Sequence, residues 1–401
     1  MSRELEDWLS GYLEYTENSE PPTIYHKFCG LSVLAGVLQR RVYLKWSFEE
    51  IFPNLYVILV GPSGRTRKGV ALNIAKSFLK QVPGISVAPE SSSGREAMIQ
   101  AMKRAYTNFE DPSTGKVSFH CSLSAFSEEL SVFLGQGDIK YLANLTDWYE
   151  SKQSWEYETI GRGVDSLEGL CFNMAGGTAP DWIQSMLPYE AIGGGFTARV
   201  IFVVAETKGK TVPKHTFTSR ELGLQDMLTR DLERISQMAG PMLFTSSGEH
   251  AYIEWYKEQD RLMRAGETPI ADSRFASYCE RRATHIRKIM LGLSASRGSS
   301  LQLDECDFDR ALALLTEAER EMHKTFGGLG KSRTSEPLEM VMAYMKQVGF
   351  STRKSLLGKF YRDIDAQTLQ SVEQQLEQMK VMHVRLLPDQ GDKSYTWIGD
   401  K

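Results

Sequence analysis

The stretch LYVILVGPSGRTRKGV, residues 55–70, decides the fold of this chain. Its first six residues, Leu55–Val60, form a continuous apolar run, which is typical of a β-strand covered on both faces. Val70–Leu79 follows with apolar residues at helical spacing. A basic segment with glycines joins the two, and the backbone N–H groups of such a segment attract anions at the start of the next helix. The stretch therefore predicts a phosphate-binding loop between a strand and a helix.

We expect ten consecutive residues to bind the phosphates: Gly61, Pro62, Ser63, Gly64, Arg65, Thr66, Arg67, Lys68, Gly69 and Val70. In the usual pattern a glycine is followed by four residues and then by Gly-Lys-Ser/Thr. That spacing puts Arg67 where lysine is usual, and Lys68 comes one position later. We interpret Lys68 as the phosphate lysine, with Arg67 as the alternative. No hydroxyl follows Lys68, so Mg²⁺ would use Ser63, Thr66 or water, and a basic turn without a ligand is the competing interpretation.

An acidic pair follows the second apolar strand, Val117–Phe126, as Glu128 and Glu129. We expect this strand to lie beside the strand of the phosphate loop. Glu128 would then hold the water shell of Mg²⁺, and Glu129 would orient and polarise an attacking water. The competing interpretation is a helix start, because a serine before two glutamates suits any helix N-terminus. The position downstream of a phosphate loop favours the catalytic interpretation.

Two further strands carry polar residues near their ends. In the third strand, Leu167–Ala175, we expect Asn173 to contact the γ-phosphate or the water, with Thr178 as second choice. A glycine-rich turn with a satisfied asparagine is the alternative. Arg199 precedes the fourth strand, Val200–Ala205, and an arginine forks onto phosphate oxygens. In a ring of subunits it would complete the neighbour's site; the alternative is a surface arginine.

A second basic cluster lies in a helical pattern further along the chain. Arg281, His285 and Lys288 share one face at helical spacing. One arginine of this cluster could sense nucleotide, but we expect most of the cluster to be a solvated basic face.

Alternation of strands and helices over residues 53–207 predicts a parallel α/β sheet. Residues 1–45 are expected to form a helical cap and 216–328 a helical lid. A Gly/Ser-rich linker, 326–335, separates the lid from three helices and a β-hairpin, the order of a winged helix. We therefore predict four parts: 1–45, the core 46–215, the lid 216–328 and a winged-helix domain 329–401.

Composition excludes several classes of protein. The chain has 401 residues with 47 basic and 51 acidic side chains, a net charge of −4, so any nucleic-acid contact must be local. Five cysteines without a C-x-x-C pair fit no zinc pattern. The acidic N-terminus has no signal-peptide pattern, and no apolar run approaches the ~20 residues of a membrane span. We expect a cytoplasmic protein without membrane contact.

Together the loop, the segment Phe126–Leu134 and the segment Gly194–Arg199 resemble the P-loop ATPases of phages and integrative elements. Members of that family are often described as primase-linked helicases or as domains of unknown function. The resemblance spans roughly residues 20–325 and implies ATP and Mg²⁺ as ligands, in a P-loop NTPase core of the AAA+/RecA-like kind. The order of core, lid and winged helix is also similar to AAA+ replicative helicases of the minichromosome maintenance type.

The likeness to those helicases implies a homo-oligomer, a hexameric ring, with single-stranded DNA as partner. The segment Ser151–Asp165 would then supply a pore loop, in which charge and aromatic stacking bind the strand through Lys152, Trp155, Tyr157 and Arg162. The alternative is a surface hairpin whose aromatic side chains pack onto their own domain.

The sequence thus predicts an ATP-dependent DNA helicase or translocase acting in phage or mobile-element replication. The alternative is a replication initiator or helicase loader that switches with nucleotide and recruits other replication proteins. If the side chains of 151–165 face a channel, the helicase or translocase is favoured. If they pack on the core, the initiator or helicase loader is favoured.

Overall fold

The computed structural model describes residues 3–89, 94–112, 115–135, 138–159, 163–187, 192–326, 335–361, 363–386 and 392–399. The chain divides into two units, residues 1–327 and 328–401. The division falls in the Gly/Ser-rich stretch that the sequence analysis interprets as a linker. The expected cap, core and lid are not separate bodies, because all three belong to the first unit.

A five-stranded sheet forms the centre of the first unit. Its strand order is β4-β5-β8-β3-β9, parallel except for the edge strand β4. The strands are β3 (Tyr56–Val60), β4 (Tyr106–Asp111), β5 (Lys116–Ser127), β8 (Leu170–Thr178) and β9 (Val200–Val204). Every residue of β3, β8 and β9 is buried, as expected for strands covered on both faces. The α/β sheet expected from the sequence is confirmed.

Helices cover both faces of this sheet. Successive residues of a strand point to opposite faces. Asn173 bonds to Ser32 O in α2, whereas the ring of Phe172 contacts Trp148 in α6 at 5.4 Å. One face therefore carries α2 and its neighbour α3, and the other carries α6. The helices up to β9 are α1 (Trp8–Thr16), α2 (Thr23–Leu38), α3 (Lys68–Gln81), α4 (Arg95–Arg104), α5 (Leu130–Leu134), α6 (Ile139–Tyr149) and α7 (Pro180–Met186).

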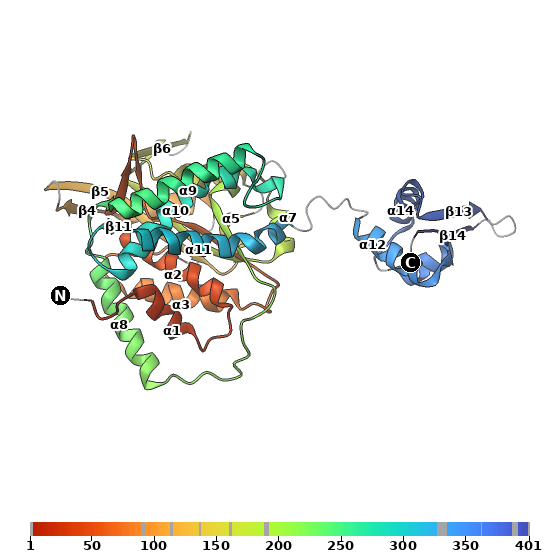
Figure 1. Ribbon diagram of the computed structural model, residues 1–401, viewed down its shortest axis with the longest axis horizontal. Helices are drawn as coiled ribbons and strands as arrows, with labels where there is room; N and C mark the ends of the chain where they lie inside the picture. The colour runs from red at the N-terminus through yellow and green to blue at the C-terminus, as the bar shows by residue number, and fades with distance from the viewer. Residues whose placement is uncertain are drawn as a thin grey trace. The chain divides into compact units, whose positions relative to one another are not determined.

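The prediction of an N-terminal cap is wrong for α2. This helix packs against α3, β3 and β8 in the core, and Figure 1 shows α1, α2 and α3 next to one another. Thirteen of its 16 residues are buried. Lys27 is its only charged residue, and a helix that is apolar all round belongs in the interior.

The lid is not purely helical, because a second sheet ties it to the N-terminal region. The strand order is β11-β10-β1-β2, with β1 parallel to β10 and Val42 opposite Gly240. These strands are β1 (Val42–Trp46), β2 (Glu49–Ile51), β10 (Gly240–Phe244) and β11 (Gln302–Leu303). The helices are α8 (Ser219–Ile235), α9 (Ser246–Arg264), α10 (Ala276–Arg297) and α11 (Glu305–Met322), all within the expected lid. In the part of the chain that the structure describes, no helix is long and apolar enough to cross a membrane.

The second unit contains the expected three helices and hairpin, with one additional short strand. Its elements are α12 (Ser335–Val348), β12 (Phe350–Thr352), α13 (Arg353–Lys359), α14 (Ala366–Gln378), β13 (Met382–Leu386) and β14 (Lys393–Trp397). The strands form an antiparallel sheet in the order β12-β14-β13. The unit has its own core, in which Leu369, Leu376 and Tyr395 are buried.

Because each unit has its own core, we expect them to unfold separately. Leu376→Ala removes a fully buried side chain and should lower the free energy of unfolding of the second unit by about 2–5 kcal/mol. Scanning calorimetry should show a lower unfolding temperature for the second unit and an unchanged one for the first. Gln378→Ala, at an exposed position of the same helix, is the control. One shared transition that shifts as a whole would show that the two units fold together.

Candidate functional site

The carboxyl ends of four parallel strands lie at one edge of the main sheet. Val60 of β3 is level with Thr178 of β8 and Val204 of β9, and Ser127 of β5 is level with Gly176. From β3 the chain continues to β4 and β5, at one side of the sheet. From β8, the neighbour of β3, it continues to β9 at the other side. Such a reversal opens a crevice beyond the strand ends, where ligands of open α/β sheets bind.

The expected phosphate loop lies at this edge of the sheet, between the end of β3 and the start of α3. Two of its residues have positive φ, Gly64 at 68° and Arg67 at 57°. Gly61 has no room for a side chain, since a Cβ there would lie 2.5 Å from Ala205 O. Thr66 is buried whereas Ser63 is exposed, so of the two hydroxyls considered for Mg²⁺ only that of Ser63 is presented on the surface.

Lys68 folds back over the loop. Its ammonium donates to Gly61 O at 2.6 Å and Pro62 O at 3.4 Å. Burial lowers the pKa of Lys68, and the nearby Glu129 carboxylate partly offsets this. An ammonium that rests on the loop carbonyls can turn to a phosphate held by the loop.

Arg67 points away from the loop. Its guanidinium donates to Glu20 at 2.7 Å. Lys208 and Arg67 together lower the pKa of Glu20 to about 2. Of the two cations between which the sequence left a choice, the geometry favours Lys68 as the phosphate residue.

The acidic pair reaches the loop across a strand rather than from its neighbour. The expectation that β5 lies directly beside β3 is wrong, because β8 lies between them. Gly177 of β8 makes the close approach feasible: a Cβ there would lie 2.9 Å from Glu128 O and 3.4 Å from Lys68 Cβ. Gly177 lies beyond Ala175, the expected end of the third strand, although a glycine inside a strand signals close backbone approach.

Both carboxylates have local partners. Glu128 accepts from the Asn73 amide of α3 at 2.8 Å and lies against Gly69, whose Cβ would be 2.4 Å from its Oε2. Glu129 is the N-cap residue of α5 and accepts from Ser131 Oγ at 3.2 Å. Among the described residues no group of three or more His, Cys, Asp or Glu could hold a metal ion. Two carboxylates next to a phosphate loop nevertheless suit Mg²⁺, which usually takes one or two carboxylates, substrate phosphates and water.

A mostly apolar pocket of about 250 Å³ adjoins the start of α3. Val70 and Ile74 of α3 line it, and Tyr15 and Phe217 face each other there with ring centroids 6.2 Å apart. Val70 is 44% exposed. The pocket therefore offers a flat apolar space two residues beyond Lys68.

Asn173 is not at the strand tip where it was expected. It precedes the end of β8 by five residues and is 2% exposed. Its amide accepts from Leu55 N at 3.0 Å and donates to Ser32 O at 2.9 Å, so it fixes the start of β3 at the opposite edge of the sheet. The prediction that Asn173 contacts the γ-phosphate or the attacking water is therefore wrong. Thr178, the second choice, ends β8, and its carbonyl accepts from Gly61 N at 3.1 Å.

Arg199 also lies at the edge opposite the phosphate loop, directly before β9. It is 8% exposed and donates to Glu150 at 2.8 Å and to Gly195 O at 2.7 Å. The alternative of a surface arginine is wrong. Arg199 lies at the other end of β9 from its own loop, so a phosphate contact would need another copy of the chain.

The aromatic residues expected in a pore pack on their own unit. They lie on the hairpin of β6 (Ser154–Thr159) and β7 (Gly163–Glu168). Trp155 is 8% exposed and meets Trp148 edge-on at 5.5 Å, and Tyr157 lies between Trp155 and the Arg95 guanidinium. Lys152 is half-exposed and pairs with Asp147 at 3.0 Å, and Arg162 lies outside the described residues. The prediction that Trp155 stacks on DNA is therefore wrong, because its ring is buried in its own unit.

The basic face of α10 is not solvated as expected. His285 is fully buried and bonds to Tyr149 Oη and Ala198 O, both at 3.1 Å. Lys288 is 4% exposed and donates to Phe52 O at 2.9 Å and Asn54 Oδ1 at 2.7 Å. Arg281 is half-buried and pairs with Glu150 at 3.0 Å.

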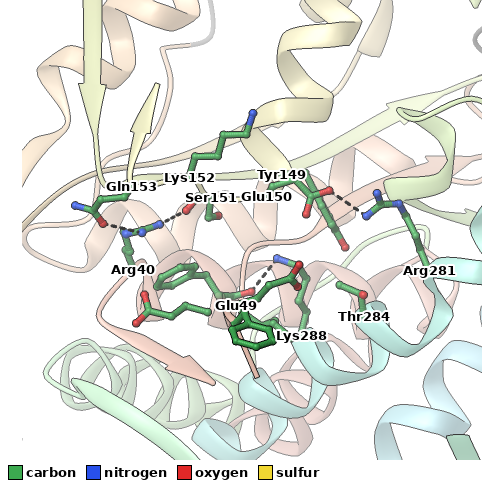
Figure 2. Close-up of a pocket in the computed structure, with 14 residues that line it drawn as sticks. Arg40, Glu49, Tyr149, Glu150, Ser151, Lys152, Gln153, Arg281, Thr284 and Lys288 are labelled. Carbon is green, nitrogen blue, oxygen red and sulfur yellow. Dashed lines mark hydrogen bonds and ion pairs between the residues drawn. The ribbon is translucent and has the colours of Figure 1, made fainter. Parts of the chain in front are cut away.

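Arg281 and Lys288 line a second cavity, of about 830 Å³, at the amino ends of the strands. Figure 2 shows residues from four places in the chain around it: Arg40 after α2, Glu49 of β2, the segment 149–153 and the face of α10. Burial lowers the pKa of Lys288 to about 7. A large cavity with a perturbed lysine is a candidate binding site in its own right.

The close approach at Gly177 can be tested by adding a methyl group. Gly177→Ala should lower the free energy of unfolding by about 1–3 kcal/mol, because the backbone of Glu128 has to move. Gly223→Ala in α8, where a Cβ meets nothing within 4 Å, is the matched control and should be stabilising by about 0.5–1 kcal/mol. Urea titrations measure both. Equal effects of the two substitutions would contradict the close contact.

Burial of Lys288 should appear in the pH dependence of stability. Between pH 7 and the unfolded value of 10.5 the unfolded chain binds a proton that the folded chain has lost. The free energy of unfolding should therefore rise with pH in this window, relative to Lys288→Met, by up to about 1.4 kcal/mol per unit. Urea titrations of both proteins from pH 6.5 to 8.5 measure the difference. Parallel curves would show that Lys288 titrates normally.

Comparison with known proteins does not assign this chain to a family. No protein-family model matches the chain, and no curated protein matches it. The resemblance to P-loop ATPases therefore depends on the loop, the acidic pair and their arrangement at one edge of the sheet.

Proposed function

We propose that this chain binds ATP with Mg²⁺ at the phosphate loop and hydrolyses it. The observation that carries the proposal is the meeting of the Lys68 ammonium, the loop and the acidic pair across Gly177. A lysine on a loop at a helix N-terminus suits β- and γ-phosphates, and a pair of carboxylates opposite suits a metal ion and a water.

In this proposal the backbone N–H groups of the loop and the start of α3 hold the phosphates. Lys68 leaves the carbonyl oxygens of Gly61 and Pro62 and neutralises charge on the transferred phosphoryl group. Glu128, oriented by Asn73, holds the metal through its water shell. When bound, Mg²⁺ supplies further neutralisation of the charge that develops on the phosphate oxygens.

Glu129 accepts the proton of the attacking water. A bond forms between the water oxygen and the γ-phosphorus as the bond from that phosphorus to the β–γ bridging oxygen breaks, giving ADP and inorganic phosphate. The proton then passes from Glu129 to solvent. Ser131 orients the carboxylate.

The apolar pocket beside Val70 and Ile74 would take the adenine ring. Its position follows from the chain, because α3 leads from Lys68 directly along the pocket wall. Tyr15 and Phe217 offer aromatic faces for stacking, and Asn18 and Ser19 offer polar groups for the base edge.

The wider function that we propose is ATP-dependent movement on DNA in phage or mobile-element replication, by a hexameric ring. Arg199, which lies at the edge away from its own loop, would have to leave Glu150 and Gly195 O to act on a neighbour's nucleotide. Single-stranded DNA and other replication proteins are the partners of this proposal.

A second candidate is a nucleotide-dependent initiator or helicase loader. Trp155 and Tyr157 favour it, because their rings are engaged by Trp148 and Arg95 of the same unit instead of facing a channel. A loader needs slow hydrolysis and a change of shape, whereas a motor needs DNA to accelerate turnover.

Steady-state ATP hydrolysis with and without single-stranded DNA tests both candidates. Lys68→Ala and Glu129→Gln should each lower kcat by roughly 100-fold or more, since each removes a charge that acts in the transition state. Arg67→Ala should stay within a few-fold of wild type, because Arg67 faces Glu20.

The matched control for Lys68→Ala is Lys80→Ala, in the last turn of the same helix. Strong stimulation by DNA would favour the translocase, and slow hydrolysis indifferent to DNA would favour the loader. Loss of activity in Arg67→Ala alone would mean that Arg67 is the phosphate residue. A wild-type protein without hydrolysis under any condition would overturn the proposal.

A further inference from the structure

Two cations lie buried at the second cavity without a carboxylate partner. Arg40 is 7% exposed and donates to Leu170 O and Gln153 Oε1, both at 3.0 Å. Lys288 is 4% exposed and donates to Phe52 O and Asn54 Oδ1. Among the described residues neither takes part in an ion pair. A cation bonded only to neutral oxygens is costly to bury, and the carboxylates of Glu50 and Glu150 act on these two cations only at longer range. An anionic group of a ligand would therefore stabilise their charged forms.

The cavity is much larger than a simple anion needs. Its volume of about 830 Å³ falls in the range of sites that hold cofactor-sized molecules. Besides the cations it has aromatic walls. Phe52 and Tyr149 are already covered by Arg40 at 3.9 Å and Lys288 at 4.4 Å. Phe48, in the turn between β1 and β2, is fully exposed and has no ring or cation contact among the described residues.

Charge is distributed unevenly around the cavity. Arg281, Thr284 and Lys288 come from one face of α10 and supply hydrogen-bond donors, and Lys152 adds a charge nearby. Glu49 and Glu50 come from β2 and supply acceptors. Glu150, the third carboxylate, already accepts from Arg199 and Arg281. A ligand that fits carries an anionic group at one end and a flat ring with N–H donors at the other.

We propose that this cavity binds a nucleotide, with the phosphate facing Arg281 and Lys288 on α10 and the base stacked on Phe48. The exocyclic amino group of a base donates to Glu49 or Glu50, as carboxylates accept from the cytosine amino group in other complexes. The site is separate from the phosphate loop, because the two lie at opposite ends of the same strands.

The nucleotide can be free or part of a single strand of nucleic acid, since the chemistry of phosphate and base is shared. Lys152, a predicted nucleic-acid contact that stays exposed, lines this cavity and not the aromatic hairpin. Stacking on an aromatic ring next to basic side chains is the usual way in which proteins hold single strands.

The experiment uses the full chain carrying Lys68→Ala, so that the phosphate loop does not contribute. Binding of fluorescein-labelled (dC)₁₂ is followed by anisotropy, and unlabelled dCMP serves as competitor. In this background Phe48→Ala and Arg281→Gln should each weaken binding by about 10-fold or more. Lys257→Gln is the matched control: it removes one exposed positive charge on α9 and should leave binding unchanged. Thermal unfolding of each variant verifies that it is folded.

Binding of (dC)₁₂ that dCMP does not displace would identify a single strand as the ligand, and displacement by dCMP would identify a free nucleotide. The proposal is overturned if neither probe binds, or if Phe48→Ala and Arg281→Gln bind as tightly as their background. Binding that wild type shows and Lys68→Ala lacks would assign the ligand to the phosphate loop and also overturn it. Failure of ATP hydrolysis would leave this test intact.

Discussion

The absence of a side chain at Gly177 is the constraint on which the phosphate-loop site depends. β8 separates the loop strand from the acidic strand, and a strand with ordinary side chains would hold them apart. At Gly177 the backbone carbonyl of Glu128 enters the space that a Cβ would fill, and the Cβ of Lys68 lies directly against it. Gly176 does the same for Leu130, the first residue of α5. Two glycines thus bring together a cation and two anions that come from non-adjacent strands.

The sequence predicts the elements of this edge well because each has a strong local signal. The run Leu55–Val60 with the loop after it, and the acidic pair, are each a continuous stretch of sequence, and a strand covered on both faces has few alternatives. Strand order has no such signal, which is why β5 was expected beside β3. Gly176 and Gly177, which allow the contact across β8, are visible in the sequence. A Gly-Gly pair, however, more often marks a turn than a close approach of two backbones.

Burial by residues that are distant in the chain explains the other predictions that were wrong. Asn173, His285 and Lys288 are polar, and polar residues near strand ends or on helix faces are usually solvated or functional. Here each is satisfied inside the protein: Asn173 by Leu55 and Ser32, His285 by Tyr149 and Ala198, and Lys288 by Phe52 and Asn54. Their partners lie between 87 and 236 residues away in the chain, so no local pattern could reveal them. Burial of α2, in contrast, could have been predicted from its near lack of charge.

β3 connects the two candidate sites. Its start is fixed by two buried asparagines, since Asn54 donates to Tyr149 O and Phe172 O and Asn173 accepts from Leu55 N. Its end leads directly into Gly61 and the phosphate loop. Asn54 also accepts from Lys288 at the floor of the second cavity, so the cation that would meet a nucleotide there is bonded to the residue that anchors the loop strand. A five-residue strand, paired with β8 on one side and β9 on the other, therefore joins the partner of Lys288 at its start to the phosphate loop at its end.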